Sequence, residues 1–265
     1  MASETIGIMA AFPRGGSRAG NREHTRPGAR GQLFPVLVAP PPRAHYYART
    51  MQVLYLIRHA ETGFNRVGRV QGHTESTLSR LGHTQARRTG ERLGYVDFVA
   101  AYASPSRRTL QTARIALGDR VDVNAREGLR EINLGAWEGL KASTLRKRYP
   151  RQVHLWFHKP SAVRIAGAET VAQFRRRVVR EMKGIRETHP KGEIAVVTHG
   201  GVICVYLTAL LGMKLDDLWQ FKIRNASVTR VLFPQGRARV DLLGDIHHLN
   251  GAFREIPNRP FRLFP

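Results

Sequence analysis

Two histidines come at the ends of apolar runs of strand length. His59 follows residues 53–57 and stands beside Arg58, and His199 follows the apolar run over residues 194–197. In open parallel sheets, ligand sites form at the carboxyl ends of strands, where loops meet helix N-termini that favour anions. A neutral imidazole is also a competent nucleophile near neutral pH, because its unperturbed pKa is about 6.5. The two histidines therefore predict a site at one edge of a sheet that could hold and attack an anionic group.

The elements that would position these histidines alternate along the chain from Met51 onward. We expect strands over residues 53–57, 98–102, 121–123, 194–197, 228–233 and 240–243. We expect helices over residues 81–93, 104–117, 143–149, 170–188 and 200–211. This alternation predicts an α/β protein, a three-layer α/β/α sandwich with a mostly parallel central sheet.

Two segments fall outside this alternation. Residues 1–50 are rich in Arg, Pro and Gly and poor in acids, so we expect a disordered N-terminal extension, with an organellar transit peptide as the minority alternative. Within the domain expected over residues 51–265, Pro150 is expected to end a short helix. We therefore expect a small, loop-rich cap at about residues 141–167, where Trp156 and its neighbours Phe157 and His158 could form an apolar wall for a substrate.

Five sequence blocks occur in order along the rest of the chain. They are residues 56–62 with Asn65, Gln71 and Gly72; residues 104–113; residues 129–131 with 135–139; residues 167–170; and residues 198–201. In these blocks the sequence resembles the phosphoglycerate mutase-like histidine phosphatase family, from about residue 53 to residue 249. The resemblance implies the phosphoglycerate mutase-like fold. Ala60 departs from the family, which commonly has glycine there, and an alanine is tolerated if its φ is not positive.

The resemblance also implies a role for each polar residue of these blocks. His59 would attack phosphorus to form a phosphohistidine, and Glu131 would give a proton to the leaving alkoxide. The other catalytic residues would bind the phosphoryl oxygens: the charged forks of Arg58 and Arg108, with His199 as a further donor. The expected substrate-binding residues are Asn65, Gln71, Gly72 and Gly200. Arg107 and Glu138 are the less favoured rivals of Arg108 and Glu131, and the chemistry requires no metal and no other cofactor.

Several activities occur in this family. The stretch between Glu131 and His199 is short, whereas the mutases carry a longer basic insertion there that guards the intermediate from water. We therefore expect a metal-independent phosphatase of the broad-specificity or α-ribazole phosphatase type, acting on a small phosphorylated metabolite. A cofactor-dependent phosphoglycerate mutase is the alternative. A non-catalytic protein that binds a phosphate ligand or nucleic acid is the second.

Composition limits partners and location. The chain has 43 Lys and Arg against 20 Asp and Glu, a net charge of +23, which suits capture of anions. Nucleic acid is an unlikely partner, because no basic stripe is interleaved with aromatic residues. Cys204 is the single cysteine, so we expect a reducing, cytoplasmic location, and no apolar run reaches the roughly 20 residues of a membrane span. His154 and His158 have the spacing of metal ligands on a helix but lack an obvious third ligand. The sequence does not determine the oligomeric state, and a homodimer is one possibility.

Overall fold

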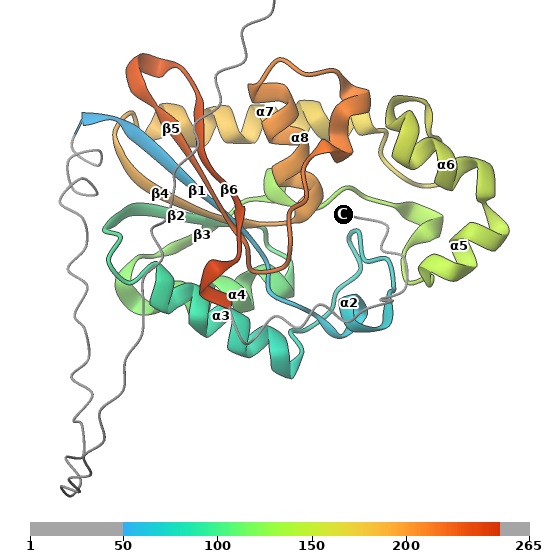
Figure 1. The fold of residues 1–265 in the computed structure, drawn as a ribbon, viewed down its shortest axis with the longest axis horizontal. Coiled ribbons are helices and arrows are strands. Elements are labelled where there is room, and N and C mark those ends of the chain that lie inside the picture. The colour runs from blue at the N-terminus through green and yellow to red at the C-terminus, as the bar shows by residue number, and fades with distance from the viewer. Residues whose placement is uncertain (1–49, 250–265) are drawn as a thin grey trace, which may run out of the picture. The chain divides into compact units, whose positions relative to one another are not determined.

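The computed structural model, shown in Figure 1, describes residues 50–249. Its six strands form one sheet in the order β3-β2-β4-β1-β5-β6. The strands are β1 (Gln52–Arg58), β2 (Phe98–Ala103), β3 (Val123–Ala125), β4 (Gly192–Thr198), β5 (Val228–Phe233) and β6 (Arg239–Asp245). The pairs β1·β4, β2·β4 and β2·β3 are parallel, whereas β5 runs antiparallel to both β1 and β6. The sheet is therefore mostly parallel, as expected, with two antiparallel pairings at one side.

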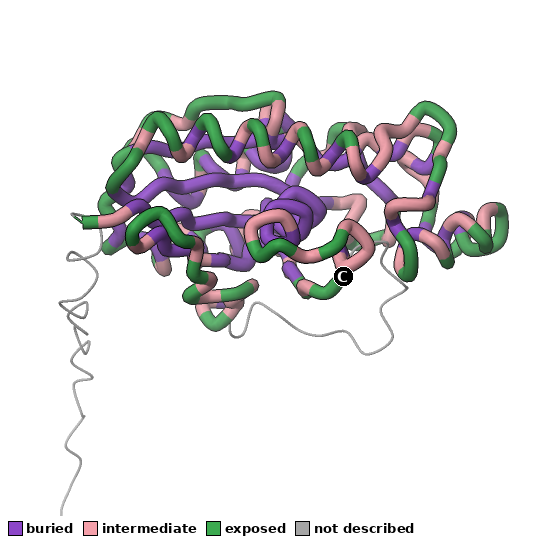
Figure 2. Tube along the Cα trace, turned by 90° about the horizontal axis from the view of Figure 1, so that it is seen from above, coloured by how far each residue is buried: buried purple, intermediate pink, exposed green. Residues whose placement is uncertain are grey.

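Helices cover both faces of this sheet. Helices α3 (Arg80–Arg92) and α4 (Arg107–Leu117) lie on one face, and α7 (Val171–Thr188) and α8 (Gly200–Leu210) lie on the other (Figure 1). In Figure 2 the buried strands run between these two partly exposed helical layers. Alternate residues of β1 belong to different clusters, since Leu54 packs toward the α7 and α8 side and Val53 toward the α3 and α4 side. The expected three-layer α/β/α sandwich is confirmed.

Local sequence signals explain where the helices of the α7 layer begin and which side they bury. Thr170 caps α7 and forms a capping box with Gln173, which satisfies backbone N–H groups that the first turn leaves unpaired. The buried residues of α7 recur every three or four positions, from Val171 through Phe174 to Ile185, so they form one apolar stripe. Helix α8 is buried from Gly200 to Thr208, which fits its apolar sequence on nearly every side.

The cap at residues 141–167 differs from the expectation of a loop-rich segment. It contains α5 (Ala142–Arg148), α6 (Pro150–His158) and the short η4 (Pro160–Ala162). The helix expected over residues 143–149 is present as α5 and ends before Pro150. Pro150 also occupies the first turn of α6, where its missing N–H costs nothing because no intrahelical partner exists there. The prediction of loops was wrong because proline before a helix and proline after a helix look alike in sequence.

The expected apolar wall in the cap is also corrected. Trp156 is fully buried, with its ring 5.9 Å from that of Trp137 and 5.1 Å from that of Trp219. Phe157 packs against the same cluster, and His158 is exposed. Trp156 and Phe157 therefore pack the cap against the α7 side of the sheet, and neither lines the pocket that holds His59.

Other differences are small. Ser106, not Ser104, occupies the N-cap position of α4, and the third strand is displaced by two residues to Val123–Ala125. A further α-helix, α2 (Gly63–Val67), lies between β1 and α3, and the other helical segments are short 3-10 turns. Within residues 50–249, no helix combines the length and the apolar character needed to cross a membrane. The expectation for the N-terminal extension lies outside the described residues, except at Thr50.

Candidate active site

His59 directly follows β1 and is almost fully buried. Its Nδ1 lies 2.8 Å from the carbonyl oxygen of Ala60. Because a carbonyl only accepts, Nδ1 must carry the proton, which leaves the lone pair on Nε2. Burial, followed by the positive charges of Arg108 and Arg58, holds the pKa of His59 well below its usual value of 6.5. His59 is therefore a neutral imidazole with a defined tautomer.

The backbone of His59 is held from both sides. Its N–H donates to the carbonyl of Thr198 in β4 at 2.8 Å, and its carbonyl accepts from the backbone of Ala226 and from Asn225 Nδ2 at 3.0 Å. Asn225 was not predicted. It lies in the loop before β5, and only the antiparallel pairing of β5 with β1 brings that loop to the end of β1. The sequence around Asn225 carried no signal that could have found it.

Arg108 projects from the first turn of α4 and is fixed at three donors. Its Nη2 donates to the carbonyl of Gly72 at 2.8 Å, its Nη1 to that of Thr74 at 3.1 Å, and its Nε to His199 Nδ1 at 3.3 Å. Arg108 is 1% exposed, and burial lowers its pKa to about 10. Arg107, the sequence rival, is exposed. The spacing argument for Arg108 thus agrees with its inward position.

Arg58 supplies a second buried guanidinium group at the end of β1. Its Nη1 donates to the carbonyl of Ile223, and it is 5% exposed. Burial lowers the pKa of Arg58, while the carboxyl group of Glu131 opposes that shift. Two buried cations next to each other are costly unless an anion compensates them, so this part of the structure is suited to binding a phosphoryl group.

His199 lies against His59, with the two rings edge to face and their centroids 5.3 Å apart. Because Arg108 Nε can only donate, His199 Nδ1 is an acceptor and its Nε2–H donates to Ser104 Oγ at 2.8 Å. Burial, then Arg108, holds the pKa of His199 well below 6.5. Both ring nitrogens are thus engaged, and His199 orients Arg108 instead of presenting a free N–H group.

Asn65 and Gln71 resemble each other in that the oxygen of each side-chain amide is already hydrogen-bonded within the protein. Asn65 Oδ1 accepts from the backbone of Thr62 and from Asn225, and Gln71 Oε1 lies within hydrogen-bond distance of the hydroxyl groups of Thr62 and Ser76. With each amide oxygen occupied, the NH₂ groups are left as the available ends. Both side chains line the pocket that holds His59, so the pocket is lined by donors on this side.

Glu131 is the buried acid of the site. Its carboxylate accepts from the backbone N–H groups of Ile132 at 3.0 Å and Gly201 at 3.1 Å, the latter in the first turn of α8. Burial raises its pKa above the usual 4.5, although these hydrogen bonds oppose the shift. Gly201 is required for this contact, since a Cβ there would lie 2.3 Å from Glu131 Oε1.

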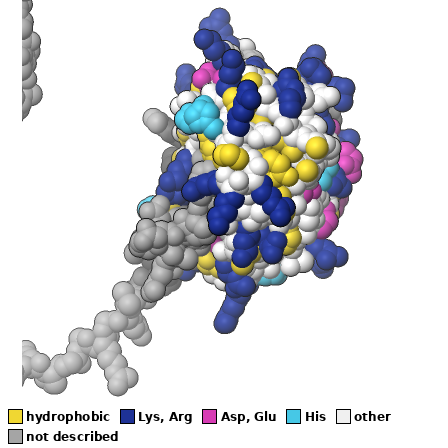
Figure 3. Space-filling model, turned by 90° about the vertical axis from the view of Figure 1, so that its right-hand side faces the viewer, with side chains coloured by type: hydrophobic (Ala, Val, Ile, Leu, Met, Phe, Trp, Pro, Cys, Tyr) yellow, Lys and Arg dark blue, Asp and Glu magenta, His cyan; other side chains and the backbone are white. Residues whose placement is uncertain are grey.

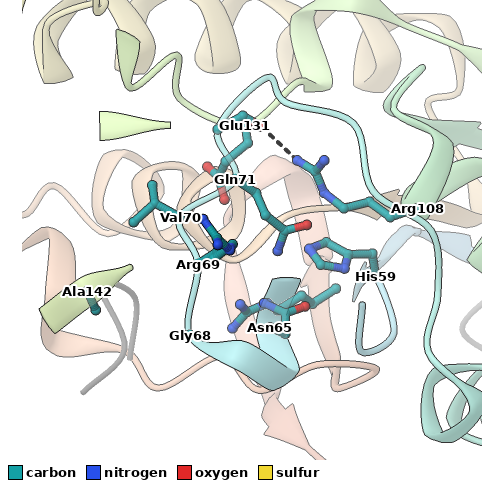
Figure 4. A pocket seen from close by; sticks show the side chains of 11 residues that line it. His59, Asn65, Gly68, Arg69, Val70, Gln71, Arg108, Glu131 and Ala142 are labelled. Atoms are coloured by element: carbon teal, nitrogen blue, oxygen red, sulfur yellow. Dashed lines mark hydrogen bonds between the residues drawn. The ribbon is translucent and has the colours of Figure 1, made fainter. Parts of the chain in front are cut away.

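The pocket has two unlike parts (Figure 4). The part that we call the inner wall consists of the expected site residues Arg58, His59, Asn65, Gln71, Gly72, Arg108 and Glu131. The part that we call the outer rim consists of Gly68, Arg69, Val70 and Ala142. Seven of the nine predicted site residues thus line one pocket. The other two, His199 and Gly200, do not line it but contact the pocket residues Arg108 and Arg58. The outer rim was not predicted.

Gly72 and Gly200 are explained by close approach. Gly72 has φ +53°, and a Cβ there would lie 2.1 Å from Glu138 Oε1. Glu138 accepts from the backbone of His73 and Thr74 and so fixes the loop whose carbonyls hold Arg108, which is a structural role. A Cβ on Gly200 would lie 3.1 Å from Arg58 Cζ, so this glycine leaves room for Arg58.

Ala60 fits its position without strain. It is not among the residues with positive φ, its side chain is fully buried beside Ala86, and its N–H donates to Thr112 Oγ1 at 3.0 Å. The methyl group that departs from the family pattern is therefore accommodated by core packing.

The His154 and His158 pair and Cys204 lie apart from this chemistry. The two imidazoles stack on α6 with centroids 4.4 Å apart. Over the described residues, no group of three or more His, Cys, Asp or Glu side chains gathers where it could hold a metal ion. Cys204 is buried in α8, and burial raises the pKa of its thiol to about 12.

Comparison with known proteins agrees with this arrangement. Residues 54–246 match the family model of the histidine phosphatase superfamily (branch 1). Phosphoserine phosphatase 1 of Hydrogenobacter thermophilus is 31% identical over 206 residues, which cover 77% of this chain and 98% of that protein. A metal-independent phosphoserine phosphatase of Arabidopsis thaliana is 30% identical over 204 residues, covering 75% and 84%. The solved structure of YhfR from Bacillus stearothermophilus has a TM-score of 0.72 and 33% identity, covering 75% and 99%. The chain therefore belongs to the histidine phosphatase superfamily, branch 1.

Proposed function

We propose that this chain is a metal-independent phosphatase that hydrolyses small phosphomonoesters through a phosphohistidine on His59. One observation carries the proposal. His59 has its proton held on Nδ1 and its lone pair on Nε2, in a pocket that it shares with the guanidinium groups of Arg58 and Arg108. A neutral, buried nucleophile beside two permanent positive charges is the arrangement that phosphoryl transfer needs, because its catalysis is mostly positioning and charge stabilisation.

In the first step, His59 Nε2 attacks phosphorus and the bond from phosphorus to the ester oxygen breaks. Arg58, Arg108 and the amides of Asn65 and Gln71 bind the three phosphoryl oxygens, whose charge spreads as the bond breaks. The leaving alkoxide takes a proton from Glu131, whose raised pKa keeps that proton available. The products are the alcohol, a phosphohistidine and the Glu131 carboxylate.

In the second step, water attacks the phosphohistidine. The Glu131 carboxylate takes a proton from this water, the P–N bond breaks, and its electron pair returns to Nε2 of His59. Inorganic phosphate leaves, and the enzyme is back in its starting protonation state. His199 and Gly200 act in both steps as positioning residues, His199 through Arg108 and Gly200 by leaving space for Arg58.

Two further features support the setting of this reaction. The relatives named phosphoserine phosphatase support a small phosphorylated metabolite as the substrate. A single buried thiol, which cannot form an intrachain disulfide, supports the proposed cytoplasmic location. Fractionation of cells that express the tagged full chain tests the location, and recovery in the membrane or secreted fraction would contradict it.

Phosphate release in the presence of EDTA tests the reaction. The full chain is assayed with O-phosphoserine, 3-phosphoglycerate and p-nitrophenyl phosphate, beside His59→Ala and the control His158→Ala on the exposed face of α6. We expect release that survives the chelator, persists in the control and disappears in His59→Ala. Radiolabelled phosphate from the ester should also remain on the wild-type chain after rapid alkaline denaturation, but not on His59→Ala.

Two outcomes would contradict the proposal. Conversion of 3-phosphoglycerate to 2-phosphoglycerate that outruns phosphate release would identify a mutase. Equal activity of His59→Ala and wild type would remove His59 from the chemistry.

A further inference from the structure

The inner wall accounts for the phosphoryl group but not for the alcohol to which it is attached. Every charged or amide side chain of the inner wall has a role at phosphorus or at the ester oxygen. The leaving alcohol must therefore extend past these groups toward the outer rim. Figure 4 places Val70 and Ala142 across the pocket from His59 and Arg108. Arg69 is the single charged residue among the four residues of the rim.

Arg69 is held in place by the chain segments that form the rim. Its backbone bridges Lys141 in an antiparallel pair, and its Nη1 donates to the carbonyl of Gly139 at 2.6 Å. A guanidinium group has five N–H donors in a rigid fork, so one anchoring hydrogen bond leaves most of them available. Arg69 is exposed, in contrast to the buried Arg58 and Arg108, and so it can reach a ligand at the mouth of the pocket.

The chain around Arg69 carries more basic than acidic residues, and the neighbouring acid, Glu138, accepts hydrogen bonds from the backbone of His73 and Thr74. Among the described residues, none of the ion pairs includes Arg69. Residues 139–168, which continue from the rim into the cap, contain seven Lys or Arg and no Asp or Glu. Figure 3 shows Lys and Arg side chains spread over the face of the molecule that carries this cap. The field at the rim therefore favours an anionic group over a neutral or cationic one.

We propose that Arg69 binds a carboxylate on the leaving alcohol, so that this enzyme prefers phosphomonoesters of hydroxy acids. The planar fork of an arginine matches the two oxygens of a carboxylate, which selects the class of substrate without taking part in bond breaking. This inference rests on the proposed function, because it concerns the alcohol that the reaction releases.

Two pairs of substrates isolate the carboxylate. O-Phosphoserine and O-phosphoethanolamine differ only by the carboxylate, and so share their amine. 3-Phosphoglycerate and glycerol 3-phosphate differ by a carboxylate in place of a hydroxymethyl group, and neither has an amine. We expect wild type to favour the carboxylate member of each pair by about 10-fold in kcat/KM, in the range of a charge-assisted hydrogen bond at a partly screened site.

Three variants of the full chain test the residue. Arg69→Gln removes the charge but keeps a donor for the Gly139 carbonyl, and we expect it to abolish most of the preference, chiefly through a higher KM for the carboxylate substrates. Arg69→Glu should reverse the preference within the phosphoserine pair. Arg66→Gln is the matched control, because Arg66 is an exposed arginine on α2 that does not line the pocket, and its preference should equal that of wild type.

The outcomes separate this inference from the proposed function. If wild type hydrolyses both members of each pair equally well, or if Arg69→Gln keeps the full preference, Arg69 does not recognise a carboxylate. The proposed phosphatase function is unaffected by that result. If wild type releases phosphate from no ester at a rate above that of His59→Ala, the proposed function fails and this inference falls with it.

Discussion

The inner wall and the outer rim of the pocket are built by opposite means. Residues of the inner wall such as Arg108 and Glu131 are buried, and each is fixed by hydrogen bonds from other elements of the sandwich. The rim is formed by a few residues whose backbones pair between Gly68 and Ala142, and its charged residue, Arg69, is exposed. The charged groups of the inner wall therefore lie in the core of the fold, whereas the one charged group of the rim lies at the surface, beside the buried side chains of Val70 and Ala142.

This difference separates chemistry from specificity. A buried polar group that loses its partner pays the full cost of desolvation, so the inner wall tolerates little change. An exposed arginine can be replaced with an effect limited to its own contact, because solvent screens it. Changes to the inner wall should therefore lower turnover for every substrate, whereas changes to the rim should change the order of substrates.

The largest effect after loss of the nucleophile is expected at Glu131. Glu131→Gln keeps the shape of the side chain but removes the proton, so kcat/KM on O-phosphoserine should fall by about 10²–10⁴-fold. The loss of kcat/KM on p-nitrophenyl phosphate should be much smaller, because p-nitrophenolate leaves without a proton and kcat/KM does not include the attack of water on the phosphohistidine. Initial rates at low concentrations of both esters check this, and equal losses of kcat/KM would show that Glu131 is not the proton donor.

A somewhat smaller effect is expected from Gly201→Ala, which removes no polar group. The added Cβ would lie 2.3 Å from Glu131 Oε1, so the carboxyl group must move, and a displacement of this kind costs about 10²-fold in rate. Gly184→Ala is the control, since a Cβ on this exposed glycine of α7 meets nothing within 4 Å. The control should keep wild-type rates and raise the free energy of unfolding by about 1 kcal/mol. A Gly201→Ala protein that is folded by circular dichroism and fully active would show that the position of Glu131 is not critical.

The smallest effect is a change of shape in the pH profile. His59 is neutral until the pH falls well below 6.5. Protonation of the nucleophile should therefore not lower kcat/KM as the pH falls through 6.5. Glu131 stays protonated above pH 4.5 and loses its proton as the pH rises through its raised pKa, so activity should decrease on the alkaline side. Near such a limb the rate changes about tenfold per pH unit. Glu131→Gln should lack the alkaline limb, and a limb that persists in this variant on the same substrate would contradict its assignment.

The residues of the reaction centre could be identified largely from sequence. Each apolar strand that ends in a histidine places that histidine at the carboxyl edge of a parallel sheet, so the strand-end pattern was enough to pair His59 with His199. The resemblance to the histidine phosphatases added Arg108 and Glu131, which a pattern of apolar residues cannot reveal. Both residues are buried and line the same pocket as His59.

Other parts of the site depended on contacts between distant segments. Asn225 reaches the carbonyl of His59 only because β5 runs antiparallel to β1, and the apolar pattern of a strand does not encode its direction. His199 was expected to donate to the substrate, but Arg108 and Ser104 occupy its two nitrogens. The second helix of the cap, α6, was missed because proline occurs both after the end of one helix and in the first turn of the next.

Local patterns in the chain were sufficient to predict the α/β sandwich, the family and His59 as the proposed nucleophile, because apolar periods and strand-end motifs lie within short stretches of residues. The hydrogen-bond partners that fix His59 and Arg108, and the charge at the mouth of the pocket, emerged only from the folded arrangement. These features depend on segments such as 68–70 and 139–142, or β1 and the loop before β5, that are far apart in sequence. Their meeting is set by packing of the whole sheet and its helices, which no short stretch of sequence contains.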